Sequence, residues 1–557
     1  MSSLRCVILL LLLPVWLLEN QCLALDKNSI DIPSSGLSLL IVQDGGRKKP
    51  LDTYARENLI KLTGRSKWKD SEGGEWTALE VIADMFLGTN NWQKEKLIKV
   101  GHILLKKEVG LDINEKFFSY QDLHTNQELM KNLSQIIRIE EDAPQYDKTL
   151  SFEAKVLLQK IRLVEKLTAS EAFSWIPAPK GESWFSLIEG IEFYKEKGKN
   201  IQQNYENLKT VYLAGGDRNF SDCVNILFEN LRSLVSPNDY PQGKIRIEVF
   251  YNNLHPFRLA WIACLISFVL MLIANQQKSL GKAIYWFGLG VFGLGTILQV
   301  IGFILRTVIS SRAPVTNMYE VLVFMALGAS LIAFFYELFC RSKIFILSAA
   351  VVTAVVLILA DNLPTVFDPS IQPLVPVLRS NWWLTVHVIT ITIGYAAFLQ
   401  ALGIGHISVF YYLFKPQEEK SIQSLTKFNC RTMQIGVFFL SAGTLLGALW
   451  AEKAWGRFWG WDPKETWALI ALLIYLAVLH ARYVGWIKGF GLNAASILAF
   501  QGIIMAGYGV NYILGTGKHS YGFGIGGEEI VAIFVGIEIL LVLFAVIRYR
   551  MKRLKND

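Results

Sequence analysis

The connection WGRFWGWDPKETWALI, residues 455–470, combines residue types that could bind a ligand. It holds four tryptophans and the charged residues Arg457, Asp462, Lys464 and Glu465, but no serine, cysteine or histidine. Apolar runs flank it on both sides, so we expect it at a membrane surface. An aromatic belt is one explanation, because tryptophan favours that level. Charges among indole rings favour another: a site for a flat, apolar ligand whose carboxylates meet Arg457 or Lys464.

Three of these tryptophans lie close to an acidic residue in the sequence. Trp455, Trp459 and Trp461 crowd around Asp462, and we predict that these four residues cradle the ligand. An aromatic belt is the simpler interpretation of Trp450, at the end of the preceding apolar run.

Two histidines are candidates for metal ligation beside this connection. His387 lies in NWWLTVHVITITIGYAAF and His519 in GTGKHSYGFG. Either one alone would be expected to have a structural role. If both lie at the depth of the tryptophan-rich connection, two imidazoles at one site could supply the axial ligands of a haem iron.

A third histidine, His480 in LIYLAVLHARYVGW, lies within an apolar run 13 residues after Trp467. That separation corresponds to about 20 Å along a helix. An ionisable residue at such depth marks a functional site, and we expect its ring to face the bundle or a cavity. His406 lies near the inner end of another apolar run. It could equally be a ligand or a residue at the membrane interface.

The elements that position these residues are apolar segments. The chain of 557 residues is 52% hydrophobic, and its mean hydropathy of +0.33 favours a membrane protein, because so much apolar surface needs lipid to cover it. The predicted fold is mainly α, with a polytopic bundle of about nine transmembrane helices in residues 257–557. We place the spans near 257–275, 283–305, 321–340, 343–360, 384–413, 433–451, 466–485, 493–513 and 529–547.

Basic residues orient this bundle. The five positive clusters lie in every second connection and in the tail at 548–553, all on the side opposite the tryptophan-rich connection. The positive-inside rule therefore places His387, His519 and residues 455–470 on the outer side. We predict a bacterial inner (cytoplasmic) membrane protein with its ligand site facing the periplasm. The formal charge of +8 is modest and does not predict nucleic-acid binding.

The N-terminal part has a different composition. Residues 1–24 resemble a signal peptide, with an uncleaved anchor as the alternative. Residues 25–256 contain no segment of membrane length, so we predict a soluble, largely helical extracytoplasmic domain.

Cap residues predict two helices in this domain. Asp52 or Thr53 could cap a helix that ends before Gly64, and Thr77 with Glu80 matches a capping box.

The six cysteines include no CxxC or CxxCH. Neither a disulfide framework nor a c-type cytochrome is predicted.

These residues together resemble a known family. WGRFWGWDPKETWALI is similar to the tryptophan-rich WWD signature of haem-handling cytochrome c assembly proteins, and its Trp-Asp-Pro-Lys-Glu-Thr form resembles CcsA of the system II pathway. The stretches RAPVTNMYEVLVF, LVPVLRSNWWLTVHV, LTKFNCRTMQIG, LHARY and GKHSYGFG resemble CcsA in the same order. The resemblance covers roughly residues 280–548. Residues 25–256 have no clear counterpart in a minimal CcsA, and no CcsB domain is evident, so the chain resembles an unfused form.

The resemblance implies a function. CcsA proteins act with CcsB, also called ResB, to deliver haem to the outer face and promote its attachment to CxxCH of apocytochrome c, a holocytochrome c synthase type of activity. By position, His387 and His519 match the external haem ligands, His480 matches the transmembrane histidine, and Trp455 to Asp462 match the haem-cradling loop. The implied cofactor is a transient b-type haem. Implied partners are a CcsB/ResB-like membrane protein, apocytochrome c and a thiol-reducing thioredoxin-like protein, in a setting of membrane lipid.

Other classes of function stay open. A haem exporter, or a haem chaperone of the CcmC or CcmF type without lyase chemistry, is the first alternative. An electron-transfer cytochrome b would need histidines paired about 13–14 residues apart on two helices, whereas His387 and His406 share one span and are 19 apart.

Overall fold

The computed structural model describes most of the chain. Its described residues are 34–70, 73–88, 90–142, 148–169, 173–215, 219–237, 239–276, 280–341, 343–364, 366–374, 380–514 and 527–554. The predicted signal peptide at 1–24 and the predicted ligand His519 lie outside them.

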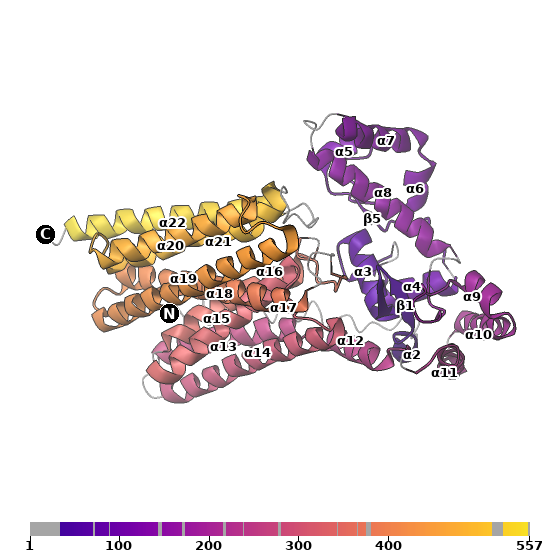
Figure 1. Cartoon of the computed structure of the whole chain (residues 1–557), viewed down its shortest axis with the longest axis horizontal. Coiled ribbons are helices and arrows are strands. Elements are labelled where there is room, and N and C mark those ends of the chain that lie inside the picture. Colours follow the sequence, from indigo (N-terminus) through magenta and orange to yellow (C-terminus); the bar gives the residue numbers. More distant parts are fainter. Residues whose placement is uncertain are drawn as a thin grey trace. The chain divides into compact units, whose positions relative to one another are not determined.

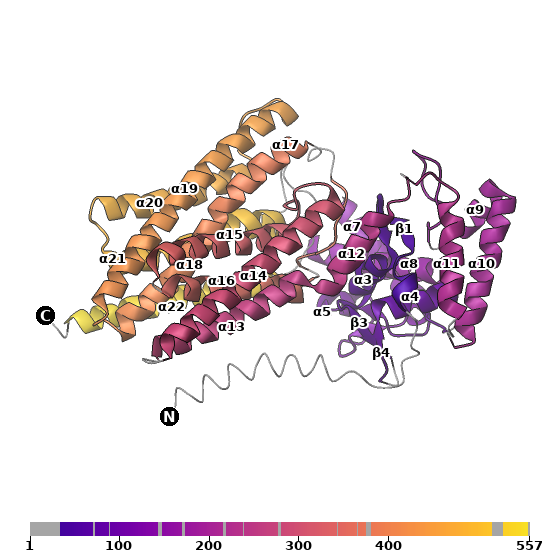
Figure 2. The same ribbon diagram turned by 90° about the horizontal axis from the view of Figure 1, so that it is seen from below.

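The described residues form two compact units. One ends at Leu254 and also includes Ser370–Pro373, and the other comprises His255–Pro369 and the residues from Leu374 onward. Figures 1 and 2 show the two units as the indigo-to-magenta and the rose-to-yellow parts of the ribbon.

The N-terminal unit is largely helical, as the sequence predicts, with three short two-stranded antiparallel sheets among its described residues. β1 pairs with β2, β3 with β4 and β5 with β6. Its elements are α2 (Ser34–Leu37), β1 (Ile41–Asp44), β2 (Arg47–Pro50), α3 (Leu51–Thr63), β3 (Lys67–Lys69), β4 (Glu75–Thr77), α4 (Ala78–Leu87), β5 (Ile98–Lys99), α5 (Ile103–Glu108), β6 (Phe117–Phe118), α6 (Tyr120–Thr125), α7 (Gln127–Asp142), α8 (Lys148–Thr168), α9 (Leu187–Tyr194), α10 (Glu196–Leu213), α11 (Asn219–Arg232) and α12 (Gln242–Leu254).

The cap predictions had different outcomes. Thr77 forms the capping box of α4 with Glu80, as predicted. The predicted cap of α3 is wrong, because this helix begins after Pro50 and has no side-chain cap. Asp52 and Thr53 are instead buried inside the first turn, where Asp52 accepts from Arg56 and the Thr53 hydroxyl donates to a distant glutamate. The helix begins earlier than predicted, so both side chains lie inside its first turn and not at its N-cap position.

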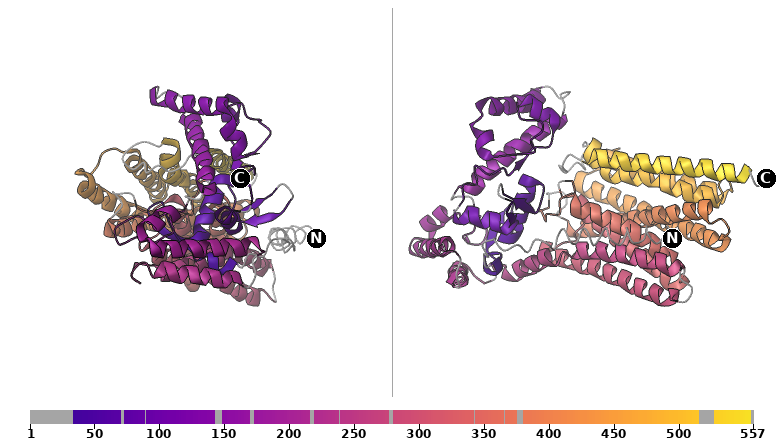
Figure 3. Two further views of the ribbon diagram at one scale, coloured as in Figure 1. Left: turned by 90° about the vertical axis from the view of Figure 1, so that its right-hand side faces the viewer. Right: turned by 180° about the vertical axis from the view of Figure 1, so that it is seen from behind.

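The second unit is a bundle of long apolar helices. Nine helices among the described residues are long and apolar enough to cross a membrane, and each coincides with a predicted span. The elements are α13 (Pro256–Gln276), α14 (Gly281–Ser310), α15 (Met318–Cys340), α16 (Ile344–Asn362), α17 (Asn381–Trp383), η2 (Leu384–Val388), α18 (Ile389–Phe414), α19 (Glu419–Trp455), α20 (Pro463–Tyr483), α21 (Gly489–Ile504), η3 (Met505–Leu514) and α22 (Glu528–Leu554). Figure 3 shows these helices side by side from two further directions.

The sixth span differs most from its predicted bounds. α19 begins at Glu419, well before the predicted start at residue 433. The extra turns contain charged residues, so hydropathy marked only the apolar part of a longer helix.

Small residues bring the central helices together. At Gly394 of α18, an added Cβ would lie 2.9 Å from the backbone nitrogen of Leu440 on α19. Glycine therefore permits the backbones of these two helices to approach closely, as is common between membrane helices.

Two spans contain a π-helical segment in the described part of the bundle, namely η2 before α18 and η3 after α21. π-Helical turns are rare, occur mostly as short insertions in α-helices, and are frequently found at functional sites.

Candidate functional site

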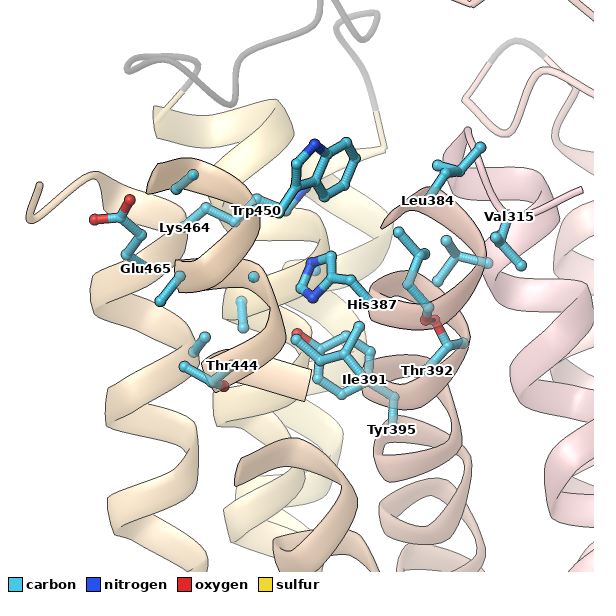
Figure 4. A pocket seen from close by; sticks show the side chains of 18 of the residues that line it. Val315, Leu384, His387, Ile391, Thr392, Tyr395, Thr444, Trp450, Lys464 and Glu465 are labelled. Atoms are coloured by element: carbon cyan, nitrogen blue, oxygen red, sulfur yellow. Dashed lines mark hydrogen bonds between the residues drawn. The ribbon is translucent and has the colours of Figure 1, made fainter. Parts of the chain in front are cut away.

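A cavity of about 180 Å³ lies at one end of the bundle. Its walls come from residues 315–318 and the start of α15, from η2 and the start of α18, from the end of α19, from the start of α20 and from η3. Both π-helical segments therefore line it. Figure 4 shows His387 near its centre, with Trp450 on one side and Ile391 and Tyr395 on the other.

The chain direction explains why these segments meet. Successive spans run in opposite directions, so the starts of α15, α18 and α20 share one end of the bundle with the ends of α19 and η3. The basic connections that contain Arg341, Lys415 and Lys488 lie at the opposite ends of the same helices. The cavity and the basic connections thus lie at opposite ends of the bundle.

His387 has a defined ring orientation. Its Nδ1 donates a hydrogen bond of 2.8 Å to the carbonyl oxygen of Gly443 on α19. In the neutral ring, Nε2 then carries the lone pair that a metal ion requires. A carbonyl that fixes the tautomer through the other ring nitrogen is the usual support of a metal-binding histidine.

Two residues of α19 hold the same ring in place. Trp450 packs edge-on against His387, with ring centroids 5.7 Å apart and an interplanar angle of 66°. At Gly447, an added Cβ would lie 2.6 Å from the His387 Cε1 atom. The ring therefore lies against α19 only because residue 447 lacks a side chain.

The structure divides the four predicted cradle residues into two pairs. Trp455 and Trp459 line the cavity. Trp461 is 70% exposed and adopts a positive φ of 55°, and it is not among the lining residues. Asp462 is buried and is the N-cap of α20, where its side chain accepts from the Lys464 backbone N–H at 3.0 Å.

The Asp-Pro-Lys-Glu stretch therefore shapes the connection. Asp462 and Glu465 form a reciprocal capping box, and Pro463 occupies the first helical position. Aspartate, proline and glutamate at these positions are a recognisable helix start. This helix-start pattern could be read from the sequence, and it gives Asp462 a structural role in addition to the predicted role in ligand binding.

Several lining residues were missed by sequence reasoning. Trp450 was interpreted as part of an aromatic belt, yet it lines the cavity. Ile391 and Tyr395 follow His387 at intervals of four residues, and such spacing places side chains on one helix face. That pattern could have identified them.

A buried ion pair supports the wall formed by residues 315–318. Arg306 Nη2 donates to Glu320 Oε1 at 2.7 Å, and the two side chains are 2% and 0% exposed. The other carboxylate oxygen accepts from the Thr316 backbone N–H and hydroxyl, each at 2.8 Å. Asn317 caps α15, because its side chain accepts from the Glu320 backbone N–H. The pair thereby fixes Thr316 and Asn317 at the cavity.

His480 lies elsewhere. It is in the last turn of α20, far from the cavity end, and its side chain is exposed. The buried residues of α20 are Ala468, Ala471 and Tyr475, and His480 is rotated about 140° from Tyr475 at 3.6 residues per turn. Of the two expected surroundings, the bundle or a cavity, the ring does not have the first among the described residues of this chain.

His406 has partners at both ring nitrogens. Nδ1 donates to the Leu402 carbonyl at 2.9 Å, and Nε2 lies 2.9 Å from Glu538 Oε2 of α22. Glu538 is buried within the last span. Sequence reasoning missed this glutamate, although an acidic residue inside an apolar run is itself a signal.

The segments that line the cavity are similar in sequence to known proteins. Residues 315–516, which include every segment that lines the cavity, match a family model described as Cytochrome C assembly protein. CcsA, a cytochrome c biogenesis protein of Prochlorococcus marinus (strain NATL1A), is 35% identical over 257 residues, which are 40% of this chain and 80% of that protein. CcsA of Chlamydomonas reinhardtii is 34% identical over 248 residues, or 42% of this chain and 67% of that protein.

A longer relative also matches the N-terminal half. Protein NrfI of Wolinella succinogenes is 27% identical over 516 residues, which cover 88% of this chain and 55% of NrfI. The chain thus spans about half the length of NrfI. Because the membrane unit alone cannot supply 88% of the chain, this match includes much of the N-terminal unit.

The cavity lies within the matched segment, and CcsA relatives match across most of their own length. The chain is therefore a multi-pass membrane protein that belongs to the cytochrome c assembly family of CcsA and NrfI, and it carries an N-terminal region beyond the CcsA-like part.

Proposed function

We propose that this protein holds haem in the cavity at the outer end of its bundle and, with a CcsB/ResB-like partner, promotes its covalent attachment to CxxCH of apocytochrome c. The observation that carries the proposal is His387. Its ring lines a tryptophan-walled cavity, and the Gly443 carbonyl sets its tautomer for metal binding.

The described residues fit haem. Its iron requires an axial nitrogen, which His387 supplies. Its apolar faces suit the indole rings of Trp450, Trp455 and Trp459 in the cavity wall. The second axial ligand that we propose, His519, lies outside the described residues.

The chemistry of attachment explains why the connection has no nucleophile. The S–H group of a CxxCH cysteine adds across a haem vinyl group: sulfur bonds to the ring-side carbon, and a proton reaches the terminal carbon. No oxidant or reductant is consumed, provided that the thiols stay reduced, for which we propose a thioredoxin-like partner. The task of this chain is to hold haem in a fixed orientation for that thiol.

The distribution of charge supports our proposal for the side of the membrane that the cavity faces. The cavity lies at the end opposite the basic connections, and the positive-inside rule assigns those to the cytoplasm. We therefore propose that the cavity and the N-terminal unit face the periplasm of a bacterial inner membrane.

The exposed position of His480 supports the proposal that a partner protein binds next to it. His480 lies in the last turn of α20, and its exposed imidazole leaves a face that a partner helix could cover. We propose that His480 and a partner histidine bind haem at a deeper position, on the route from the cytoplasm. His406 suits this role less well, because Leu402 and Glu538 already occupy its ring nitrogens.

Co-expression tests this function. The full chain, a CcsB/ResB-type partner and an apocytochrome c with one CxxCH are produced together, and covalent haem is measured by haem staining after denaturing electrophoresis. We expect attachment only when both membrane proteins are present. His480→Ala should reduce it strongly, while His406→Gln, which can still donate to Glu538, should leave it near the wild-type level.

Three results would contradict parts of the proposal. Attachment without this chain would remove its role in the chemistry. Haem release to the outer side without attachment would favour the exporter or chaperone alternative. If His406→Gln lowers attachment as much as His480→Ala, the deep position is assigned to the wrong histidine.

Replacing Gly447 with alanine tests how the His387 ring is oriented. The new Cβ would lie 2.6 Å from the ring, so the imidazole must rotate away from Gly443. Losing such orientation typically weakens metal binding about 10–100-fold. We expect that loss in a haem titration followed at the Soret band. Gly290→Ala on α14, where no atom lies within 4 Å of the added Cβ, is the matched control. Wild-type affinity in Gly447→Ala would show that α19 does not orient the ring.

A further inference from the structure

The charges around the cavity are few. Among the lining residues that the structure describes, only Lys464 and Glu465 carry a formal charge at neutral pH. They are neighbours at the start of α20, but their side chains have different surroundings. Figure 4 shows the Lys464 side chain extending from α20 toward Trp450, whereas the Glu465 carboxylate lies on the side away from His387.

Glu465 is committed to the backbone of the tryptophan-rich connection. Its Oε2 accepts from the Gly460 N–H at 2.7 Å and from the Asp462 N–H at 3.2 Å. Arg457 Nη2 lies 3.9 Å from Oε1. The Glu465 carboxylate therefore accepts hydrogen bonds from the backbone of the turn, and the Arg457 guanidinium group balances its charge.

Lys464 reaches across the cavity wall to another element. Its Nζ donates to Asn511 Oδ1 at 3.3 Å, and the Asn511 amide nitrogen donates to the Gly507 carbonyl at 2.7 Å. Asn511 lies on η3, so a π-helical segment places the amide oxygen that orients the ammonium group. The Lys464 ammonium group therefore extends from α20 and is hydrogen-bonded to η3.

The surroundings of this ammonium group favour an anionic ligand. Its neighbours in the wall include Ala468 and the aromatic rings, which give a low local dielectric constant. An ammonium group donates hydrogen bonds and accepts none, so a carboxylate oxygen is a suitable partner. Charge-assisted bonds of this kind are stronger than neutral ones.

We propose that Lys464, oriented by Asn511, binds a carboxylate of the ligand and makes the cavity selective for ligands that carry one. This inference rests on the proposed function, in which the ligand is haem and the carboxylate is one of its two propionates. His387 then binds the iron, while Lys464 binds the edge of the ring, so the two contacts together fix how haem is rotated in its plane.

The experiment compares haem with its dimethyl ester, in which both carboxylates are neutral. The purified full chain in detergent is titrated with each compound, and the dissociation constants are read from Trp fluorescence quenching and the Soret band. We expect the wild-type protein to prefer haem over the ester by about tenfold, since one charge-assisted hydrogen bond contributes roughly this factor. Lys464→Met should remove the preference, and Lys464→Arg should restore part of it.

A matched control separates a specific contact from general charge. Lys453 is an exposed lysine of α19 near the same end, its Nζ lies 5.2 Å from the Trp383 ring centroid, and it is not among the lining residues. Lys453→Met should keep the wild-type preference. Thermal unfolding of all variants checks that Lys464→Met remains folded.

Metal-free protoporphyrin IX and its dimethyl ester form a second pair of probes. Because neither contains iron, a preference for the acid in this pair depends on the carboxylates and not on His387.

The outcomes distinguish this inference from the proposed function. If wild-type protein binds haem and its ester equally, or Lys464→Met keeps the preference, the carboxylate role is overturned while haem binding stands. If Lys453→Met also loses the preference, it reflects surface charge and the inference fails. If wild-type protein binds none of the four compounds, both the inference and the proposed function fail.

Discussion

Replacing His387 with alanine is expected to abolish the haem binding that we propose for the cavity and to reduce cytochrome c maturation by at least about tenfold. His387 is the described imidazole in the cavity, and its hydrogen bond of 2.8 Å to the Gly443 carbonyl sets it up for metal binding. Loss of an axial ligand changes the electronic state of the iron. The Soret band of the purified protein should therefore disappear or shift, and added imidazole should restore part of it.

The control for this result is His406→Gln, which changes a histidine of the same helix far from the cavity. It should keep the wild-type spectrum. His519→Ala should resemble His387→Ala if His519 is the second ligand. An unchanged Soret band in the double variant His387→Ala/His519→Ala would refute the ligand assignment, and haem would have to bind elsewhere in the chain.

Replacing Arg306 with methionine is expected to destabilise the membrane unit by about 3–5 kcal/mol. Arg306 and Glu320 are almost fully buried, so the substitution leaves a carboxylate without its compensating charge. The Arg306 Nη1 bond of 3.0 Å to the Pro369 carbonyl is lost as well. Because Glu320 also holds Thr316 at the cavity wall, haem affinity should fall together with stability. Thermal unfolding in detergent and a haem titration measure the two effects.

Two further variants make this prediction specific. Adding Glu320→Gln to Arg306→Met removes the uncompensated charge but keeps an acceptor for Thr316, so part of the stability should return. Arg258→Met breaks the partly exposed pair with Asp361, where the side chains are 32% and 21% exposed, and should cost about 1 kcal/mol, clearly less than Arg306→Met. Equal losses in Arg258→Met and Arg306→Met would show that burial does not set the importance of the inner pair.

The sequence by itself determined where the membrane spans lie. Each of the nine predicted segments corresponds to a long apolar helix in the described residues, because a helix needs about 20 consecutive apolar residues to cross the bilayer. This property is local and can be read without knowing the neighbours. The capping box at Thr77 was readable for the same reason, since its groups lie within four residues. The motifs that resemble CcsA also indicated the correct family, because each of them is a short, continuous stretch of sequence.

Only the tertiary structure decided which side chains meet at the cavity. Hydropathy defines the length of a helix but not its rotation, which is set by packing against other helices. Trp450 therefore lines the cavity, although the sequence favoured an aromatic belt for it. Trp461 was predicted to cradle the ligand but does not line the cavity, and His480 lies on an exposed face.

The same reason applies to the groups that hold the site. The hydrogen bond from His387 to Gly443 joins residues 56 positions apart, and the pair of His406 and Glu538 joins residues 132 positions apart. The local π-helical turns that bring η2 and η3 to the cavity likewise have no pattern in the sequence that we could read. Contacts of this kind depend on how the spans pack, so the sequence supplied the candidate residues and the packed bundle decided which of them form the site.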